Sequence, residues 1–213
     1  MRKTEQKSSF RSVIYMHISN NLKEYFIVAI FLLIGIVLGV IFINNTSEQQ
    51  QVEISQYINT FVATIKEGKQ VNTNELLKDS IIGNVIQALI LWFVGSTVIG
   101  MPIVCGIIAF RGFSLSYTIS SIIATLGTSK GIIFCIFSIL LQNILFIPCI
   151  LALGVSGIKL YKSIMKDKRK ENIRLEIYRH TIFSLFMAFF LIVSSFIEAY
   201  ISSYLLQFYI KYI

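Results

Sequence analysis

The residues that could do chemistry in the apolar part of this chain are one acid and four amides. Glu198, in the segment SSFIEAYISSYL, is the only acidic side chain of the last apolar stretch. Amides interrupt the earlier stretches at Asn84, Gln87, Gln142 and Asn143. Polar groups at membrane depth face protein or water rather than lipid. If these stretches cross a membrane, we expect an intramembrane polar cluster in one half of a helical bundle.

Two interpretations of this cluster remain open. An ion site or proton relay would use Glu198 as its charged group, because an intramembrane acid is a functional candidate by default. A hydrogen-bonded cluster between helices would use the same side chains only to hold the helices together. The spans contain no second acid and no expected buried base, which favours the hydrogen-bonded cluster over an ion site or proton relay.

Residues typical of metal, thiol or hydrolase chemistry are dispersed. His17 and His180 have no HExxH or other ligand spacing around them, and we expect both imidazoles at the cytoplasmic membrane surface. Cys105, Cys135 and Cys149 fall in apolar segments, where an odd number of thiols indicates no disulfide scaffold. The sequence has no GxxxxGK[ST] motif. We therefore expect no enzyme active site, no metal site and no cofactor.

The elements that must position these residues are membrane helices. From Ile81 to Leu160 the chain has three charged side chains, Arg111, Lys130 and Lys159, whereas about a quarter of the residues of a soluble domain are charged. Hydrophobic residues make up 55% of the 213-residue chain, too many for a water-facing surface to cover. The sequence predicts an all-α, polytopic membrane bundle.

Five transmembrane helices are expected in a membrane domain of residues 25–206. Turns are placed at residues 110–112, around Arg111, and at residues 127–131. The spans are then residues 25–43, 81–109, 113–127, 131–158 and 181–206. All except 113–127 are long enough for a hydrocarbon core of about 30 Å at about 1.5 Å per residue.

Charged segments between the spans predict the orientation. Residues 1–24 are basic and have apolar residues spaced by four, which predicts an amphipathic helix at the membrane surface. Residues 159–180 form a basic linker, and the positive-inside rule places both segments in the cytoplasm. Residues 44–80 are then a helical outer loop, and residues 207–213 an extracytoplasmic tail.

Glycines and prolines in the spans indicate where helices pack or bend. Gly35 and Gly39 form a GxxxG pair, which lets another helix approach closely but is also frequent by chance in apolar helices. Pro102 and Pro148 are expected to interrupt the second and fourth spans. Such breaks either shape a bundle or, as in some transporters, line a binding site.

Three long strings closely resemble the stage II sporulation protein M family of endospore-forming bacteria. They are LWFVGSTVIGMPIVCGIIAFRGFSLSYTISSII, LLQNILFIPCILALGVSGIKLY and FIEAYISSYLL. The resemblance extends to GVIFINN in the first span and YINTFVATIKEG in the outer loop. The positions that match the family's motifs are Gly95, Gly100, Pro102, Gly112, Gln142, Asn143, Pro148, Gly154 and Glu198.

The resemblance implies a non-enzymatic scaffold on the mother-cell side of the sporulation septum, acting in septal wall remodelling and forespore engulfment. The implied partners are the sporulation proteins D and P, which are membrane-anchored peptidoglycan hydrolases. Membrane lipid is a further partner, a homo-oligomer stays open, and no nucleic acid is expected. We expect the first span, through Gly35 and Gly39, and the outer loop to recruit the hydrolases.

Two other functions remain open. A small transporter or permease subunit would use Glu198 and the intramembrane amides, although five spans do not divide into two equal repeats. A lipid-binding curvature sensor would use the N-terminal segment. Replacing Glu198 with Gln separates the first of these from a packing role, because a proton or ion path requires the carboxylate.

Overall fold

The computed structural model describes residues 18–67, 72–97, 99–166 and 170–211, and no strand occurs among them. The elements are α2 (Leu22–Asn44), α3 (Glu48–Lys66), α4 (Thr73–Gly95), α5 (Gly100–Leu126), α6 (Thr128–Cys135), the π-helix η1 (Ile136–Leu140), α7 (Leu141–Lys166), α8 (Lys170–Phe196), the π-helix η2 (Ile197–Ser202) and α9 (Ser203–Lys211). Most of the expected N-terminal amphipathic helix lies outside the described residues.

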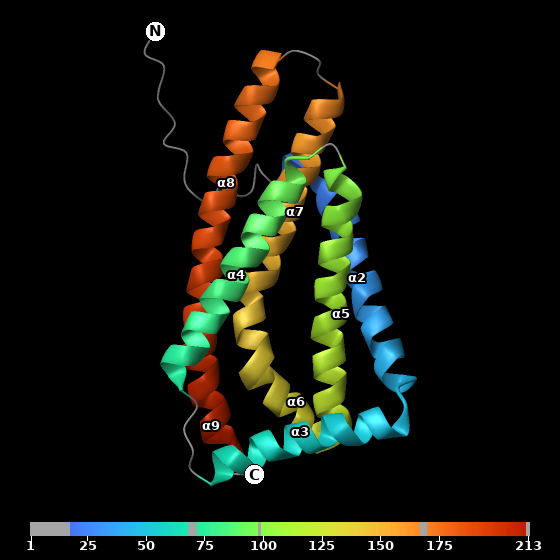
Figure 1. Cartoon of the computed structure of the whole chain (residues 1–213), viewed down its shortest axis with the longest axis vertical. Coiled ribbons are helices and arrows are strands. Elements are labelled where there is room, and N and C mark those ends of the chain that lie inside the picture. The colour runs from blue at the N-terminus through green and yellow to red at the C-terminus, as the bar shows by residue number, and fades with distance from the viewer. Residues whose placement is uncertain (1–17, 68–71, 98, 167–169, 212–213) are drawn as a thin grey trace.

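Five helical segments are long and apolar enough to cross a membrane. They are Leu22–Asn44, Thr73–Gly95, Gly100–Leu126, Thr128–Met165 and Ile173–Lys211. The predicted all-α membrane bundle of five spans is therefore confirmed as a fold class. Figure 1 shows these helices running side by side, with α3 lying across one end of the bundle.

The expected turn at residues 110–112 is wrong, because α5 runs unbroken through Arg111. The chain turns instead between Gly95, where α4 ends, and Gly100, where α5 begins. At this turn the Ser96 hydroxyl donates to the Trp92 carbonyl at 2.9 Å, satisfying an end group of α4. The second and third spans are thus 73–95 and 100–126, rather than 81–109 and 113–127.

Pro102 does not interrupt a span, contrary to expectation. It is the third residue of α5, where a missing backbone N–H removes no intrahelical hydrogen bond. Pro148 does lie inside α7. The irregular parts of the last two spans are the π-helices η1 and η2, which contact one another.

The break expected within residues 127–131 is confirmed at a single residue. Gly127 has φ +80° and ψ 161°, a backbone conformation that is essentially restricted to glycine. The helix resumes at Thr128, and Gly131 packs so closely that an added Cβ would lie 2.7 Å from the Ile123 Cα. This tight hairpin directs α6 back along α5.

The first span packs on α5 through glycines from both helices. An added Cβ at Gly35 would overlap the Ala109 carbonyl oxygen, and one at Gly39 would lie 2.5 Å from the Phe113 carbonyl oxygen. From the other side, a Cβ at Gly112 would overlap α2 at the Leu32 carbonyl. The GxxxG face is therefore occupied within the chain, and the expectation that it receives a partner's helix is wrong.

The outer loop contains the predicted helix, α3, which docks onto the bundle. Ile58 and Ile65 on its inner face join a buried cluster with Phe134 and Ile210 of the spans. The Ser55 hydroxyl lies 3.3 Å from the Thr125 hydroxyl at the end of α5. Because α3 is held by both apolar and polar contacts, it forms a cap over this end.

Candidate functional site

Glu198 joins three helical segments. It is the second residue of η2, and its Oε2 accepts a hydrogen bond from the Gln142 amide of α7 at 2.6 Å and another from the Ser80 hydroxyl of α4. A π-helical turn changes the direction of side chains relative to an α-helix and is frequent at functional sites. Glu198 and Gln142 meet as the sequence predicted, and Ser80 was missed.

Asn84 lies one turn further along α4 than Ser80 and forms hydrogen bonds with α8. Its side-chain amide donates to the Ser195 hydroxyl at 2.7 Å and to the Leu191 carbonyl at 3.1 Å. Both acceptors are buried in α8. Asn84 therefore fastens α4 to α8 next to Glu198 without contacting the carboxylate.

The remaining two amides do not reach Glu198. Asn143 donates to the Ile139 carbonyl of the preceding turn at 2.8 Å, and its own Oδ1 is buried without a hydrogen-bond partner. Gln87 is half-buried on the wall of a cleft between α4 and α5. The structure thus brings together only part of the expected cluster.

Arg111 is the polar residue that the sequence interpretation misplaced. Its guanidinium carbon lies 4.2 Å from the centre of the buried Phe146 ring, as in a cation–π contact. Its Nε is buried without a hydrogen-bond partner. The spans therefore do contain a base, which is half-buried. The only sequence signal for it was a lone charge within a long apolar stretch.

Arg111 and Glu198 form no salt bridge with one another. The salt bridges of the described residues lie elsewhere, between Lys162 and Glu24 at 2.6 Å for example. Along α7, Gln142 contacts the acid and Phe146, one turn later, contacts the base. A pair of opposite charges inside the bundle lowers the cost that each would have alone at membrane depth.

A second polar contact lies near the opposite end of the bundle. His180 is 3% exposed, so the expected surface imidazole is wrong for this residue, while His17 lies outside the described residues. Its Nδ1 is 2.8 Å from the Ser156 hydroxyl and its Nε2 is 3.3 Å from the Trp92 carbonyl. The ring therefore links α8 to α7 and α4.

The family-pattern glycines lie where helices cross. An added Cβ at Gly95 would lie 2.8 Å from the Gly157 Cα, and one at Gly154 would lie 3.3 Å from the Val104 side chain. Gly100 faces the Val94 carbonyl in the turn between α4 and α5. These residues have packing roles.

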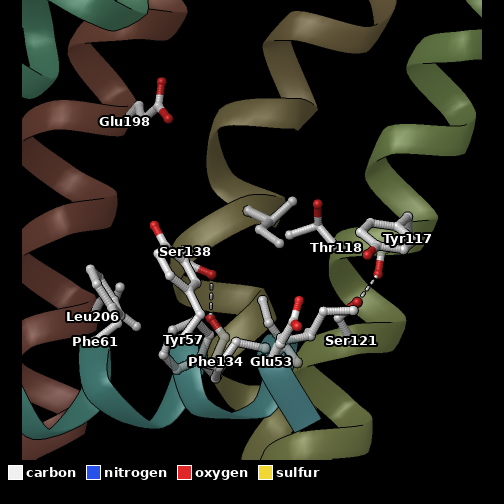
Figure 2. A pocket seen from close by; sticks show the side chains of 14 residues that line it. Glu53, Tyr57, Phe61, Tyr117, Thr118, Ser121, Phe134, Ser138, Glu198 and Leu206 are labelled. Carbon is white, nitrogen blue, oxygen red and sulfur yellow. Dashed lines mark hydrogen bonds between the residues drawn. The ribbon is translucent and has the colours of Figure 1, made fainter. Parts of the chain in front are cut away.

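Two cavities open beside the polar residues. One, of about 770 Å³, is bounded by α3, α5, α6, η1, η2 and α9. Figure 2 shows Glu198 on the η2 side of this cavity, with Tyr117 and Thr118 of α5 across it and Tyr57 of α3 below. The other, of about 550 Å³, lies between α4 and α5 and is lined by Gln87 and Arg111 among apolar residues.

Within the described residues, no group of three or more His, Cys, Asp or Glu residues could hold a metal ion. The three cysteines are free and buried.

The family model described as Stage II sporulation protein M matches residues 28–203, which is most of the chain. No curated protein and no solved structure matches it. The matched residues extend from α2 to the start of α9 and include Arg111, Gln142 and Glu198. On this match the chain belongs to the stage II sporulation protein M family.

Proposed function

We propose that the protein is a non-enzymatic membrane scaffold that recruits and anchors peptidoglycan-degrading enzymes, the sporulation proteins D and P, for septal wall remodelling and forespore engulfment. Membership of the family indicates a role in sporulation. The structural observation that best supports the finer role is α3, an ordered platform across one end of the bundle. A wall-degrading partner anchored in the same membrane could rest on such a surface.

The orientation that this function requires agrees with the distribution of charge. The end of α7 and the start of α8 lie at the end of the bundle opposite α3 (Figure 1), and these segments carry Lys159, Lys162, Arg174 and Arg179. The positive-inside rule assigns that end to the cytoplasm. The α3 end then faces the cell wall, where the substrate of the partner enzymes lies.

The platform exposes apolar side chains as well as polar ones. Tyr57 is 76% exposed and Val52 is 54% exposed, while Ile58 on the inner face is buried. Exposed aromatic residues are frequent energetic anchors at protein interfaces. Because Tyr57 also lines the 770 Å³ cavity, it would contact a partner at the edge of α3 where this cavity opens, and we expect it to contribute most to recruitment.

The test is crosslinked co-purification of the tagged full-length protein from sporulating cells, with identification of the bound proteins. Wall hydrolases should be recovered with the wild type. Tyr57→Ala should lower their recovery, by up to about 30-fold for an anchor that contributes about 2 kcal/mol. Tyr178→Ala is the matched control, because this tyrosine is 65% exposed on α8. Absence of hydrolases from the wild-type sample would refute the scaffold.

A transporter or permease subunit is the second candidate, favoured by the position of Glu198 on a cavity wall. In a transport path the carboxylate would have to bind and release a proton or cation. In a scaffold it needs only to accept hydrogen bonds from Gln142 and Ser80, which a glutamine oxygen can also do. A scaffold predicts that Glu198→Gln sporulates normally. Loss of sporulation with normal protein levels, together with recovery of a nucleotide-binding ATPase, would favour the permease.

A further inference from the structure

We propose that the cleft between α4 and α5 receives the transmembrane helix of a single-pass partner, which places an acidic or amide side chain opposite Arg111. This inference rests on the proposed function, because it supplies a binding site for the membrane anchor of a recruited enzyme. It is distinct from the α3 platform, which would meet the part of a partner outside the membrane.

The shape of the cleft fits a helix. Figure 1 shows α4 and α5 meeting at their connecting turn and diverging toward α3. The 550 Å³ cavity is lined along α5 from Ile103 to Ser114. The same face of α5 continues from Tyr117 to Ile122, where it lines the separate 770 Å³ cavity. From Ile103 to Ile122 this face is about 28 Å long at 1.5 Å per residue. A hydrocarbon core is about 30 Å thick, so this face of α5 is long enough to accompany a spanning helix over almost its whole length.

Two glycines distinguish this cleft from the packed helix crossings. An added Cβ at Gly83 of α4 or Gly106 of α5 would meet nothing within 4 Å, and both residues line the 550 Å³ cavity. By contrast, Gly35 and Gly112 are in tight contact within the chain. Small residues on opposite walls allow an incoming backbone to approach closely. No contact within the described residues explains glycine at either position.

Arg111 indicates the chemistry of the incoming helix. It lines the same cavity, and its guanidinium forms no hydrogen bond or salt bridge with the described residues. It lies 11 residues after Gly100, about 16 Å along α5 at 1.5 Å per residue, which is near the middle of the span. Glu198 accepts its hydrogen bonds from Gln142 and Ser80 and forms no salt bridge with this guanidinium.

The depth of Arg111 excludes a lipid headgroup as its intended partner. Phosphates lie at the membrane surface, about half of a 30 Å core away from the midplane. An acceptor in the middle of the core comes from protein, as a carboxylate, an amide oxygen or an exposed carbonyl. A partner helix with one Asp, Glu, Asn or Gln near its centre therefore complements the cleft in length, shape and charge.

The experiment places a photocrosslinking benzoylphenylalanine at Ile86, which is 50% exposed and lines the cleft, in the tagged full-length protein in sporulating cells. The same group at Phe189, which is 60% exposed on α8, is the control. Crosslinked peptides are identified by mass spectrometry. The proposal predicts adducts from Ile86 that map within the transmembrane helix of a single-pass protein, at least tenfold more abundant than those from Phe189.

Variants of the cleft sharpen the test. Gly106→Leu fills the cleft without meeting any atom of the chain near its Cβ, and should lower the Ile86 adduct at least tenfold with an unchanged Tm. Arg111→Gln should lower it as well. Leu185→Phe adds bulk at a 75% exposed position of α8 and should change neither the amount of the Ile86 adduct nor the Tm.

The outcomes that overturn the proposal are adducts with lipid, adducts with a second copy of this chain only, equal adducts from both positions, or an adduct that Gly106→Leu leaves unchanged. Failure of the cleft is distinguishable from failure of the scaffold. If hydrolases co-purify equally with wild type and Gly106→Leu, the cleft is refuted and the scaffold stands. If none co-purify with the wild type, the proposed function is refuted.

Discussion

A single methyl group at Gly35 should weaken the whole bundle, whereas the same methyl group at Gly106 should not. Both are glycines inside spans, in α2 and α5. A Cβ at Gly35 would overlap the Ala109 carbonyl oxygen and lie 2.7 Å from its carbon, while a Cβ at Gly106 meets nothing within 4 Å. The pair therefore compares one substitution in a closed and an open environment.

The expected loss of stability for Gly35→Ala follows from which atoms must move to make room for the methyl group. The obstacle at Gly35 is backbone, which cannot rotate away as a side chain can, so α2 and α5 must separate. Overpacking costs about 1–3 kcal/mol, and we expect the upper end of this range for Gly35→Ala. For a chain of this size about 3 kcal/mol corresponds to a fall in Tm of about 6–12 °C. Gly106→Ala should leave Tm unchanged or raise it slightly, because alanine favours helix more than glycine does.

The three buried cysteines provide the assay. Cys105, Cys135 and Cys149 are free, so a thiol-reactive fluorogenic dye reports unfolding of the detergent-solubilised protein as temperature rises. Equal Tm values for Gly35→Ala and Gly106→Ala would contradict the close packing of α2 on α5. They would also reopen the possibility that the GxxxG face is available to a partner.

Three further perturbations test other parts of the fold. Gly127→Ala forces a side chain into a backbone conformation with φ +80° and should cost about 1–3 kcal/mol, measured as a lower Tm in the same assay. His180→Ala leaves a buried hydroxyl on α7 without this partner and opens a cavity, which should cost about 1–3 kcal/mol by the same measurement; an unchanged Tm would mean that the imidazole is not buried. Ser55→Cys combined with Thr125→Cys should form a disulfide under oxidation, because the two hydroxyl oxygens are 3.3 Å apart, and peptide mapping under non-reducing conditions would detect it. If no disulfide forms between positions 55 and 125 while the Ser55→Cys and Thr125→Cys single variants remain folded, α3 is not docked as described.

The number of spans and the helix in the outer loop could be predicted because both depend on local patterns. A run of about 20 apolar residues identifies a span regardless of its neighbours. The helical spacing of Ile54, Ile58 and Ile65 indicated an amphipathic helix with an apolar face to bury. The structure buries Ile58 and Ile65 as that spacing requires.

The position of the turn between the second and third spans could not be predicted from charge alone. Arg111 looked like a surface residue, but its guanidinium packs on Phe146 from a helix distant in sequence. The true turn lies between Gly95 and Gly100 and contains Ser96 and Thr97, whose hydroxyls donate hydrogen bonds to carbonyls of α4. Serine and threonine also occur inside membrane helices, so their presence gave no clear signal.

The candidate site was predictable in its acid and in one partner only. Glu198 was conspicuous as a lone carboxylate, and Gln142 was one of four amides expected near it. Ser80 and Arg111 were missed because contacts across helices depend on how the helices are rotated about their axes. The π-helices η1 and η2 alter that rotation, and nothing in a 3.6-residue pattern reveals them.

The sequence by itself determined that this is an all-α membrane bundle of five spans, since hydropathy and helix length are properties of each segment alone. It also contained the strings that resemble the family. The tertiary structure decided which surfaces are occupied and which are free. The Gly35 face is closed by α5, whereas the Gly106 face is open. Identical residue types acquire opposite roles because a glycine's surroundings are set by helices distant in sequence.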